Sequence, residues 1–243
     1  DAGSTPDGTV RTINVAVGTS TPGVFASTSM VTTGAYTVTI PAGSGIAIGT
    51  PIMVWIDGGA VLGSVVTKAS STAVGANITG LDIYRNRLIA RHEATSATST
   101  TINDLAFYTI AQDADVTHAT TSTGEIVVRR GVELYVWGGD TFAPGGAITV
   151  AGNAGAGATE GSMTMGASSV YIASSTLRLA GSLTVPSSAT FNAGSSTIFF
   201  IASTTSKTIS APVTSIGNVT FVGNGGGWTF TSSATTSSLT ILV

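Results

Sequence analysis

The sequence of 243 residues contains no cysteine. Disulfide bonds, zinc sites built on thiolates and catalysis by a thiol are therefore excluded. Secreted proteins of this length often carry disulfides, but a chain with 42% hydrophobic residues has enough core material to fold without them.

Charged residues are also scarce. They make up 9% of the chain, against about 25% in typical soluble domains. The net charge of −3 gives no basic surface for nucleic acid. Long hydrophobic runs are missing too, because runs such as 51–56 and 198–201 fall far short of the roughly 20 residues of a membrane-spanning helix. We therefore expect neither nucleic-acid binding nor membrane insertion.

Ser, Thr, Gly and Ala fill the positions that Lys and Glu usually occupy. Thr and Val favour pleated sheets, and Ser and Gly favour turns. An outer surface of Ser and Thr repels neighbouring copies weakly and can hydrogen-bond to them. The composition predicts an all-β protein with a tendency toward regular assembly.

The charge is divided unevenly along the chain. After residue 150, only Glu160, Arg178 and Lys207 are charged, and the change coincides with the Gly/Ala-rich stretch 151–158. We place a domain boundary there, between residues 1–150 and residues 151–243.

Residues 1–150 contain short segments in which apolar and polar residues alternate. Tyr36–Ile40 reads as a strand, and 51–56 is apolar on both faces, which is typical of a central strand. Asp57 and two glycines predict a hairpin into residues 60–67. These elements predict a β-sandwich-like domain.

Two further elements are expected in this first part. Segments 125–128 and 132–137 predict another hairpin around Arg129-Arg130-Gly131. Asn103 is placed to cap one short helix that runs through residue 110.

Residues 151–243 are more regular. Apolar residues two positions apart recur every six to eight residues, and Ser, Gly, Asn or Pro separates most pairs. Each pair would point inward from a short strand and each interval would form a corner, as in a β-solenoid with one continuous core. A second sandwich of short strands is the alternative. The pairs are Met163/Met165, Val170/Ile172, Leu177/Leu179, Leu183/Val185, Ile198/Phe200, Val219/Phe221, Trp228/Phe230 and Leu239/Ile241.

Several of these segments resemble a recurring module of very large secreted or surface proteins of candidate-phyla-radiation (Patescibacteria-type) bacteria. The resemblance covers about residues 45 to 243. It implies a place at the cell surface, repetition along a long chain and no assigned enzymatic role, and it transfers no site residue. The segments that carry it are 83–93, 134–146, 191–199, 217–221 and 225–230.

Catalytic chemistry has little support in the sequence. A nucleophile or a carboxylate pair would need an orienting partner, and the two histidines, His92 and His118, lie among many hydroxyl residues by composition alone. The solenoid-like part has three charged residues in all, too few for a hydrolase or lyase face. We expect no enzyme and no cofactor.

Two weaker candidates concern binding. Asp113 and Asp115 could supply hard oxygen ligands to Ca²⁺, although solvated loop acids are the favoured interpretation. Arg85, Arg87 and Arg91 could bind an anionic glycan, but pairing with acids such as Glu93 or Glu133 is favoured. Three tryptophans could stack on sugars if exposed, yet their positions favour core packing. They are Trp55, Trp137 and Trp228.

The termini offer candidate assembly segments. The chain ends in an alternating apolar strand, and an unpaired strand of this kind seeks a partner. The start of the chain is also strand-like and follows residues 1–8. Because it opens with Asp1, we expect a processed protein or a segment of a longer one. We expect one terminus to complete a neighbouring copy head to tail, as in strand addition. The assembly residues are Val10, Ile13, Val15, Val17, Leu239, Ile241 and Val243.

The sequence therefore predicts a secreted structural protein, a subunit or repeat of a surface filament, fibre or sheath whose partners are copies of itself. The alternative is a cell-surface adhesin that binds a glycan.

Overall fold

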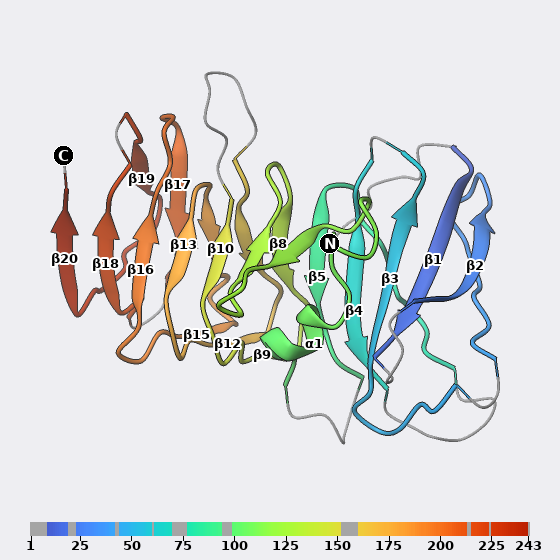
Figure 1. Ribbon diagram of the computed structural model, residues 1–243. Coiled ribbons are helices and arrows are strands. Elements are labelled where there is room, and N and C mark those ends of the chain that lie inside the picture. The colour runs from blue at the N-terminus through green and yellow to red at the C-terminus, as the bar shows by residue number, and fades with distance from the viewer. Residues whose placement is uncertain are drawn as a thin grey trace.

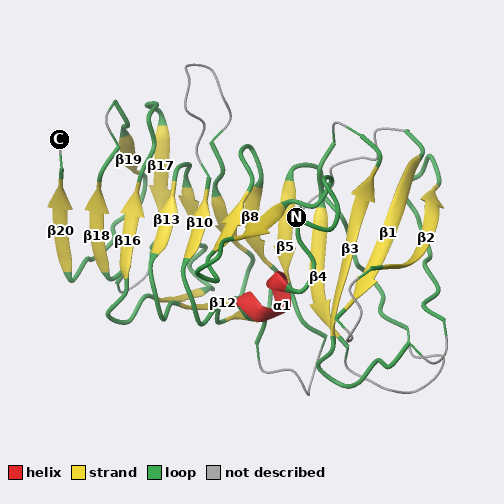
Figure 2. Cartoon of the chain, viewed as in Figure 1, coloured by secondary structure: helices red, strands yellow, loops and turns green. Residues whose placement is uncertain are grey.

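A computed structural model describes residues 9–18, 23–41, 44–59, 61–69, 77–93, 99–151, 160–212, 215–223 and 225–242. The described chain is nearly all β, with one short helix (Figures 1 and 2). The predicted all-β class is thereby confirmed. The strands form a ten-stranded sheet (sheet A), a three-stranded sheet (sheet B) and a seven-stranded sheet (sheet C).

One end of sheet A is antiparallel. β1 (Arg11–Val17) lies between β2 (Val24–Met30) and β3 (Pro51–Asp57), and β3 forms the predicted hairpin with β4 (Ser64–Lys68). β3 is the central strand that its apolar sequence indicated. Its inner face joins the main core and its outer face is covered by a second cluster.

Beyond β4 every pairing within sheet A is parallel. From β8 to β16 the chain passes from sheet A to sheet B to sheet C and then returns to sheet A, and from β17 it alternates between sheets A and C; we call each such circuit a coil. Sheet A continues through β5 (Arg87–Ala90), β8 (Glu133–Val136), β11 (Met163–Met165), β14 (Leu183–Thr184), β17 (Lys207–Ser210) and β19 (Trp228–Phe230).

The other two sheets are built from the remaining strands of the coils. Sheet B contains β9 (Thr141–Phe142), β12 (Val170–Ile172) and β15 (Thr190–Asn192). Sheet C contains β6 (His118–Thr120), β7 (Ile126–Val128), β10 (Ile148–Val150), β13 (Leu177–Leu179), β16 (Thr197–Phe200), β18 (Asn218–Phe221) and β20 (Ser238–Ile241).

Inward-facing side chains stack in register from coil to coil. In sheet C, Leu177 pairs with Ile198, Ile198 with Val219, and Val219 with Leu239, which are separations of 21, 21 and 20 residues. We call such a column of paired side chains a ladder. This parallel pairing at a nearly constant spacing is compatible with the predicted solenoid-like arrangement.

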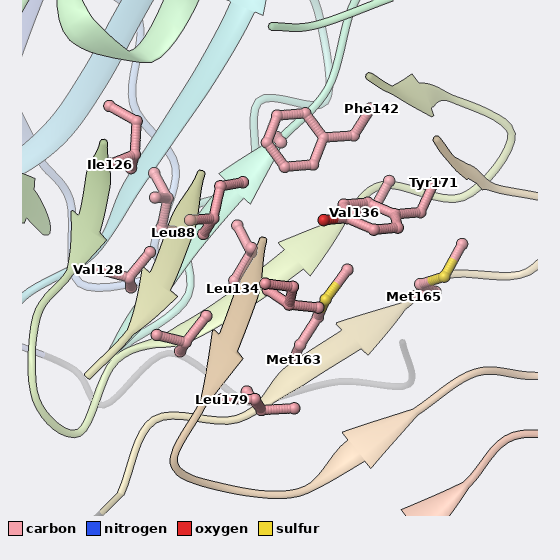
Figure 3. Packing of buried hydrophobic residues seen from close by; sticks show 14 of the residues in the cluster. Leu88, Ile126, Val128, Leu134, Val136, Phe142, Met163, Met165, Tyr171 and Leu179 are labelled. Atoms are coloured by element: carbon pink, nitrogen blue, oxygen red, sulfur yellow. The ribbon is translucent and has the colours of Figure 1, made fainter. Parts of the chain in front are cut away.

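The ladders of the sheets face one another across a single main core. Figure 3 shows Leu88, Leu134 and Met163 along neighbouring strands of sheet A, together with residues of sheet C and the rings of Phe142 and Tyr171. The cluster runs from Ala16 to Val219, and the pairs β8–β11 and β7–β10–β13 continue on both sides of residue 150. The pairing changes from antiparallel to parallel at β4, well before the boundary expected from charge.

Some predicted elements differ from the structure. The hairpin predicted over 125–137 is wrong, because β7 lies in sheet C and β8 in sheet A. In β12 the buried residue is Tyr171 rather than Val170 and Ile172, because the ring fills the core beside Phe142 and Phe191. β8, which the predicted hairpin had paired with β7, pairs with β5 and β11.

Two further predicted elements, a strand and a helix, also differ from the structure. Tyr36–Ile40 forms no strand, although its alternate side chains pack on the outer cluster of sheet A. The helix α1 covers only Ile102–Ala106, and its N-cap is Thr101 rather than Asn103, because Thr101 and Asp104 form a reciprocal capping box.

Stacked corners leave no room for a side chain at several glycines. A Cβ on Gly181 would lie 2.4 Å from the carbonyl oxygen of Gly161, in the coil next to it. A Cβ on Gly227 would make only an ordinary contact, at 3.4 Å from Thr205.

We therefore expect Gly181→Ala to lower the free energy of unfolding by about 1–3 kcal/mol, because the backbones must move apart. Gly227→Ala is the control, with a change of about 0.5 kcal/mol or less. Chemical denaturation followed by circular dichroism measures both, and equal effects would contradict the close stacking.

Candidate functional site

Three carboxylates meet at the end of β3. Asp57 is the last residue of that strand, and Asp113 and Asp115 come from the loop between α1 and β6. One ligand oxygen from each lies within 4.8 Å of the other two. Asp115 is held in place because its backbone N–H donates to Asp113 Oδ1 at 2.9 Å and Gly58 N–H donates to its Oδ2 at 2.8 Å. We call these residues the acidic cluster.

The acidic cluster is electrostatically unfavourable as three bare carboxylates. Burial, and next the charges of Asp113 and Asp115, raise the pKa of Asp57 above its ordinary value. The same cluster, after burial, raises the pKa of Tyr108. Carboxylate oxygens are the ligands that Ca²⁺ prefers, so this cluster could hold such an ion with backbone and water oxygens completing the shell.

The sequence pointed to Asp113 and Asp115 but missed Asp57. A spacing of two residues in a loop is visible locally, whereas the approach of Asp57 depends on where the loop after α1 lies against β3. The only signal was the position of Asp57 between a buried strand and a glycine turn.

We expect Asp57→Asn to stabilise the protein at pH 7 in a chelating buffer by about 0.5–1 kcal/mol, the size of exposed like-charge effects. A carboxyl whose pKa is raised in the folded state lowers the free energy of unfolding most at a pH above that pKa. This destabilisation becomes smaller as the pH falls toward 4. Thermal unfolding at pH 7 and pH 4 measures it, with Asp82→Asn as the control for an exposed acid elsewhere.

A lower melting temperature of Asp57→Asn in chelator would contradict this repulsion. Titration with Ca²⁺ then tests whether the cluster binds a cation. A bound cation would cancel the repulsion in the wild type, so the wild type would then have a higher melting temperature than Asp57→Asn.

His118 is a core residue rather than a ligand. Its side chain is fully buried in β6, and Nε2 lies 2.8 Å from the carbonyl oxygen of Leu105 in α1, so the ring links this helix to sheet C. Burial lowers the pKa of His118 to about 4, although the hydrogen bond to Leu105 opposes this shift. The ring is therefore neutral at pH 7, with Nε2–H as the donor.

This depressed pKa predicts a loss of stability in mild acid. The unfolded state binds the proton near pH 6.5 and the folded state only near pH 4. Stability is therefore complete above about pH 6.5 and falls by up to about 3 kcal/mol toward pH 4. In His118→Gln the amide can still donate to Leu105, so we expect that component of the pH dependence to vanish. Urea unfolding between pH 4 and 7.5 measures it, and parallel curves for the two proteins would contradict the assignment.

His92 belongs to a structural network. Its Nε2 accepts a hydrogen bond from the backbone N–H of Thr141 at 3.1 Å, and its own backbone N–H donates to Asp140 at 3.2 Å. Burial raises the pKa of Asp140, while the hydrogen bond from the backbone N–H of His92 and the charge of Arg91 oppose the rise. Among the described residues no hydroxyl is hydrogen-bonded to either histidine ring, so a Ser–His pair finds no support there.

The arginine stripe is paired with acids and aromatic rings. Arg87 Nε lies 2.6 Å from Glu133 Oε2, and its guanidinium stacks on Tyr84 and Tyr135. Arg91 is buried, 2.7 Å from Glu93 Oε1. The favoured interpretation, pairing with Glu133 and Glu93, is confirmed for Arg87 and Arg91, whereas Arg85 is exposed and lies outside these two pairs.

The tryptophans also lie largely within the packing. Trp55 is fully buried and its ring centroid is 4.8 Å from that of Tyr108. Trp137 packs under Arg91, and Trp228 is half-buried against Phe200.

A buried ion pair in the second half was not predicted. Glu160 Oε2 lies 2.8 Å from Lys207 Nζ, and Thr204 Oγ1 and the Ser203 N–H also donate to the carboxylate. Burial opposes its ionisation, but these donors outweigh it and hold the pKa of Glu160 below its usual value. The pair therefore fixes the loop between β16 and β17.

One open groove of about 380 Å³ lies outside β6 and β7. It has an apolar floor and two arginines at its side, and no histidine or carboxylate lines it. Its lining residues are Leu62, Ile110, Ala119, Val127, Arg129, Arg130 and Ala151. Arg129 also donates to the backbone oxygens of Ala114 and Val116.

The predicted assembly residues lie in two different environments. Ile13, Val15 and Val17 are buried in β1, which is paired on both sides, so they are not an exposed edge. Leu239 and Ile241 are exposed on β20, at the edge of sheet C. Val10 is exposed before β1, and Val243 lies outside the described residues.

Comparison with known proteins found no family model, no curated protein and no solved structure that matches the chain. No helix in the described ranges is both long enough and apolar enough to cross a membrane.

Proposed function

We propose that this chain is a structural module of an extracellular surface fibre or sheath, and that copies of it associate through the C-terminal end of the stacked coils. The proposal rests on one observation. The inward-facing ladders carry exposed apolar side chains on β19 and β20, the last described strands of sheets A and C.

The change in exposure along each ladder is abrupt. Leu177, Ile198 and Val219 are fully buried, whereas Leu239, the next member of the same ladder, is 57% exposed. In sheet A, Leu183 and Ile209 are fully buried and Phe230 is 45% exposed. These terminal side chains have the inward orientation of core residues but no described strand beyond them.

We call this surface the end face, formed by Phe230, Leu239, Ile241 and Leu242. Each of these side chains is about half exposed. No described strand pairs with the outer edge of β19 or β20, and Figure 1 places these edges at the opposite end of the molecule from β2. Unpaired edges next to exposed apolar side chains favour the addition of further strands.

The long faces support a structural role in a different way. The outward positions of sheet A from β11 to β19 carry hydroxyl side chains, such as Thr164 paired with Thr184 and Thr208 paired with Thr229. Such a face offers neither a charged cleft nor a nucleophile with a base. We assign this hydroxyl-rich face the role of a chemically unreactive outer surface.

A cell-surface adhesin is the alternative. The groove beside Arg129 and Arg130 favours it, because an apolar floor with two cations suits an anionic, partly apolar ligand such as an acidic glycan. Binding of acidic oligosaccharides that is lost in Arg130→Ala, with no self-association of the chain, would favour this alternative.

The structural proposal is tested by negative-stain electron microscopy and light scattering of the purified chain. We expect concentration-dependent end-to-end assemblies in the wild type and monomers in Leu239→Lys, because a charge at the end of the ladder opposes burial. Thr240→Lys is the matched control. It adds the same charge one residue away, at the outward position that Arg178 already occupies in β13.

The terminal ladder member is half exposed, so Leu239→Lys should keep the circular dichroism spectrum of the wild type. Assembly of Leu239→Lys to the extent of Thr240→Lys would refute the proposed role of the end face.

A further inference from the structure

We propose that the outer face of sheet A from β11 to β19 binds ice through an ordered array of hydroxyl groups. This face lies along the side of the stacked coils and shares no residue with the end face. The inference goes beyond the proposed structural role and does not depend on it. We call the outward side chains of this face the hydroxyl array. They are Ser162, Thr164, Ser182, Thr184, Thr208, Ser210, Thr229 and Thr231.

Every outward position on or directly beside these four strands carries a hydroxyl group. The inward positions alternate with them, and Met163, Leu183 and Ile209 are fully buried there. Ser and Thr make up 34 of the 93 residues from 151 to 243. Composition alone would therefore leave most of the outward positions without a hydroxyl group.

Sheet C has the same stacking but a mixed outer face. The guanidinium of Arg178 lies over the ring of Phe199 on that face. The uniform hydroxyl face is therefore a feature of sheet A and not of the fold as a whole. The paired outward residues of sheet C from β7 to β18 are Val127, Thr149, Arg178, Phe199 and Thr220.

Parallel pairing arranges the hydroxyl array as a two-dimensional grid. Thr164 pairs with Thr184, which pairs in turn with Ser210. Thr208 pairs with Thr229 in the second column. Neighbours in a column are one strand spacing apart, about 4.8 Å, and neighbours along a strand are two residues apart, about 6.6 Å. Water molecules repeat at similar distances on the prism faces of ice, so these hydroxyl groups can take the places of water molecules at an ice surface.

The hydroxyl array is available to water and is held in place by the sheet. Within the described part of the chain, the side-chain hydroxyls of Thr164, Thr184 and Thr208 have no hydrogen-bond partner in the protein. Threonine is β-branched, which restricts its χ1 angle. Ser182 Oγ is fixed to the next coil, because it accepts a hydrogen bond from the backbone N–H of Thr208 at 3.0 Å. Groups that are already ordered lose little entropy when they bind.

The hydroxyl array is also uncharged, as an ice surface is. Lys207 lies beside it, but its Nζ is 2.8 Å from Glu160 Oε2 in the ion pair described above. On the other side, the outward position of β8 next to the array is Glu133, which pairs with Arg87. Charged groups orient nearby water strongly, so the array ends where these side chains begin.

Ice-affinity partitioning tests the proposal, because a slowly growing mass of ice excludes dissolved proteins that do not bind to it. We expect the wild type to be enriched in the ice fraction and Thr184→Tyr to lower this enrichment at least fivefold, since the ring would hold the face away from the crystal. Thr220→Tyr is the matched control. It places the same ring at an outward position of sheet C, and we expect no change.

Thr208→Tyr is a second variant, in the other column of the hydroxyl array, and we expect the same loss. Circular dichroism verifies that each variant keeps the fold. Equal enrichment of Thr184→Tyr and Thr220→Tyr, or exclusion of the wild type from ice, would overturn the proposal. Retention on crystalline cellulose without enrichment in ice would overturn it in favour of a flat polysaccharide surface.

The outcomes separate this inference from the proposed function. Leu239→Lys changes the end face and leaves the hydroxyl array intact, so we expect this variant to enter the ice fraction as the wild type does. Assembly of the chain without enrichment in ice would leave the structural role standing and remove ice binding. Enrichment in ice of a chain that stays monomeric would do the reverse.

Discussion

The structure depends on the in-register stacking of inward-facing apolar side chains between parallel strands. Each ladder member is buried by the members above and below it as well as by the facing sheet. Ile198 is fully buried because Leu177 and Val219 lie on either side of it. Stability in such an arrangement is a sum of neighbour contacts, so each coil depends on the coil on either side of it.

The same stacking explains the composition. Coils that pack closely leave no room for side chains at some corners, and Gly161 and Gly181 meet there with their backbones in contact. Outward positions sit beside identical positions of the next coil, so a column of like charges would repel along its length. Thr and Ser avoid this repulsion. The charged residues that remain are mostly paired, as Glu160 is with Lys207.

Local sequence patterns predicted which side chains of a strand face the core. They could not predict which distant segments pair with one another. The two-apart apolar pairs identified Leu177 and Leu179 as core residues because alternation is a property of the strand itself. The hairpin over 125–137 failed because β8 pairs with β11, about 30 residues further along the chain. Asp57 was missed for the same reason, since its neighbour Asp115 comes from a distant loop. At β12 the size of Tyr171 decided which face turned inward.

The energy available at the end face sets the strength of any contact made there. Burying one half-exposed Leu, Ile or Phe gains about 1 kcal/mol, so Phe230, Leu239 and Ile241 of two copies together supply about 6 kcal/mol. Association itself costs about 4–15 kcal/mol, so these side chains alone do not hold two molecules together. The backbone bonds of the strand edges, at about 0.5–1.5 kcal/mol each, must supply the difference. Such a contact is reversible and depends on the register of β20, which explains why one charge in its ladder would be enough to prevent it.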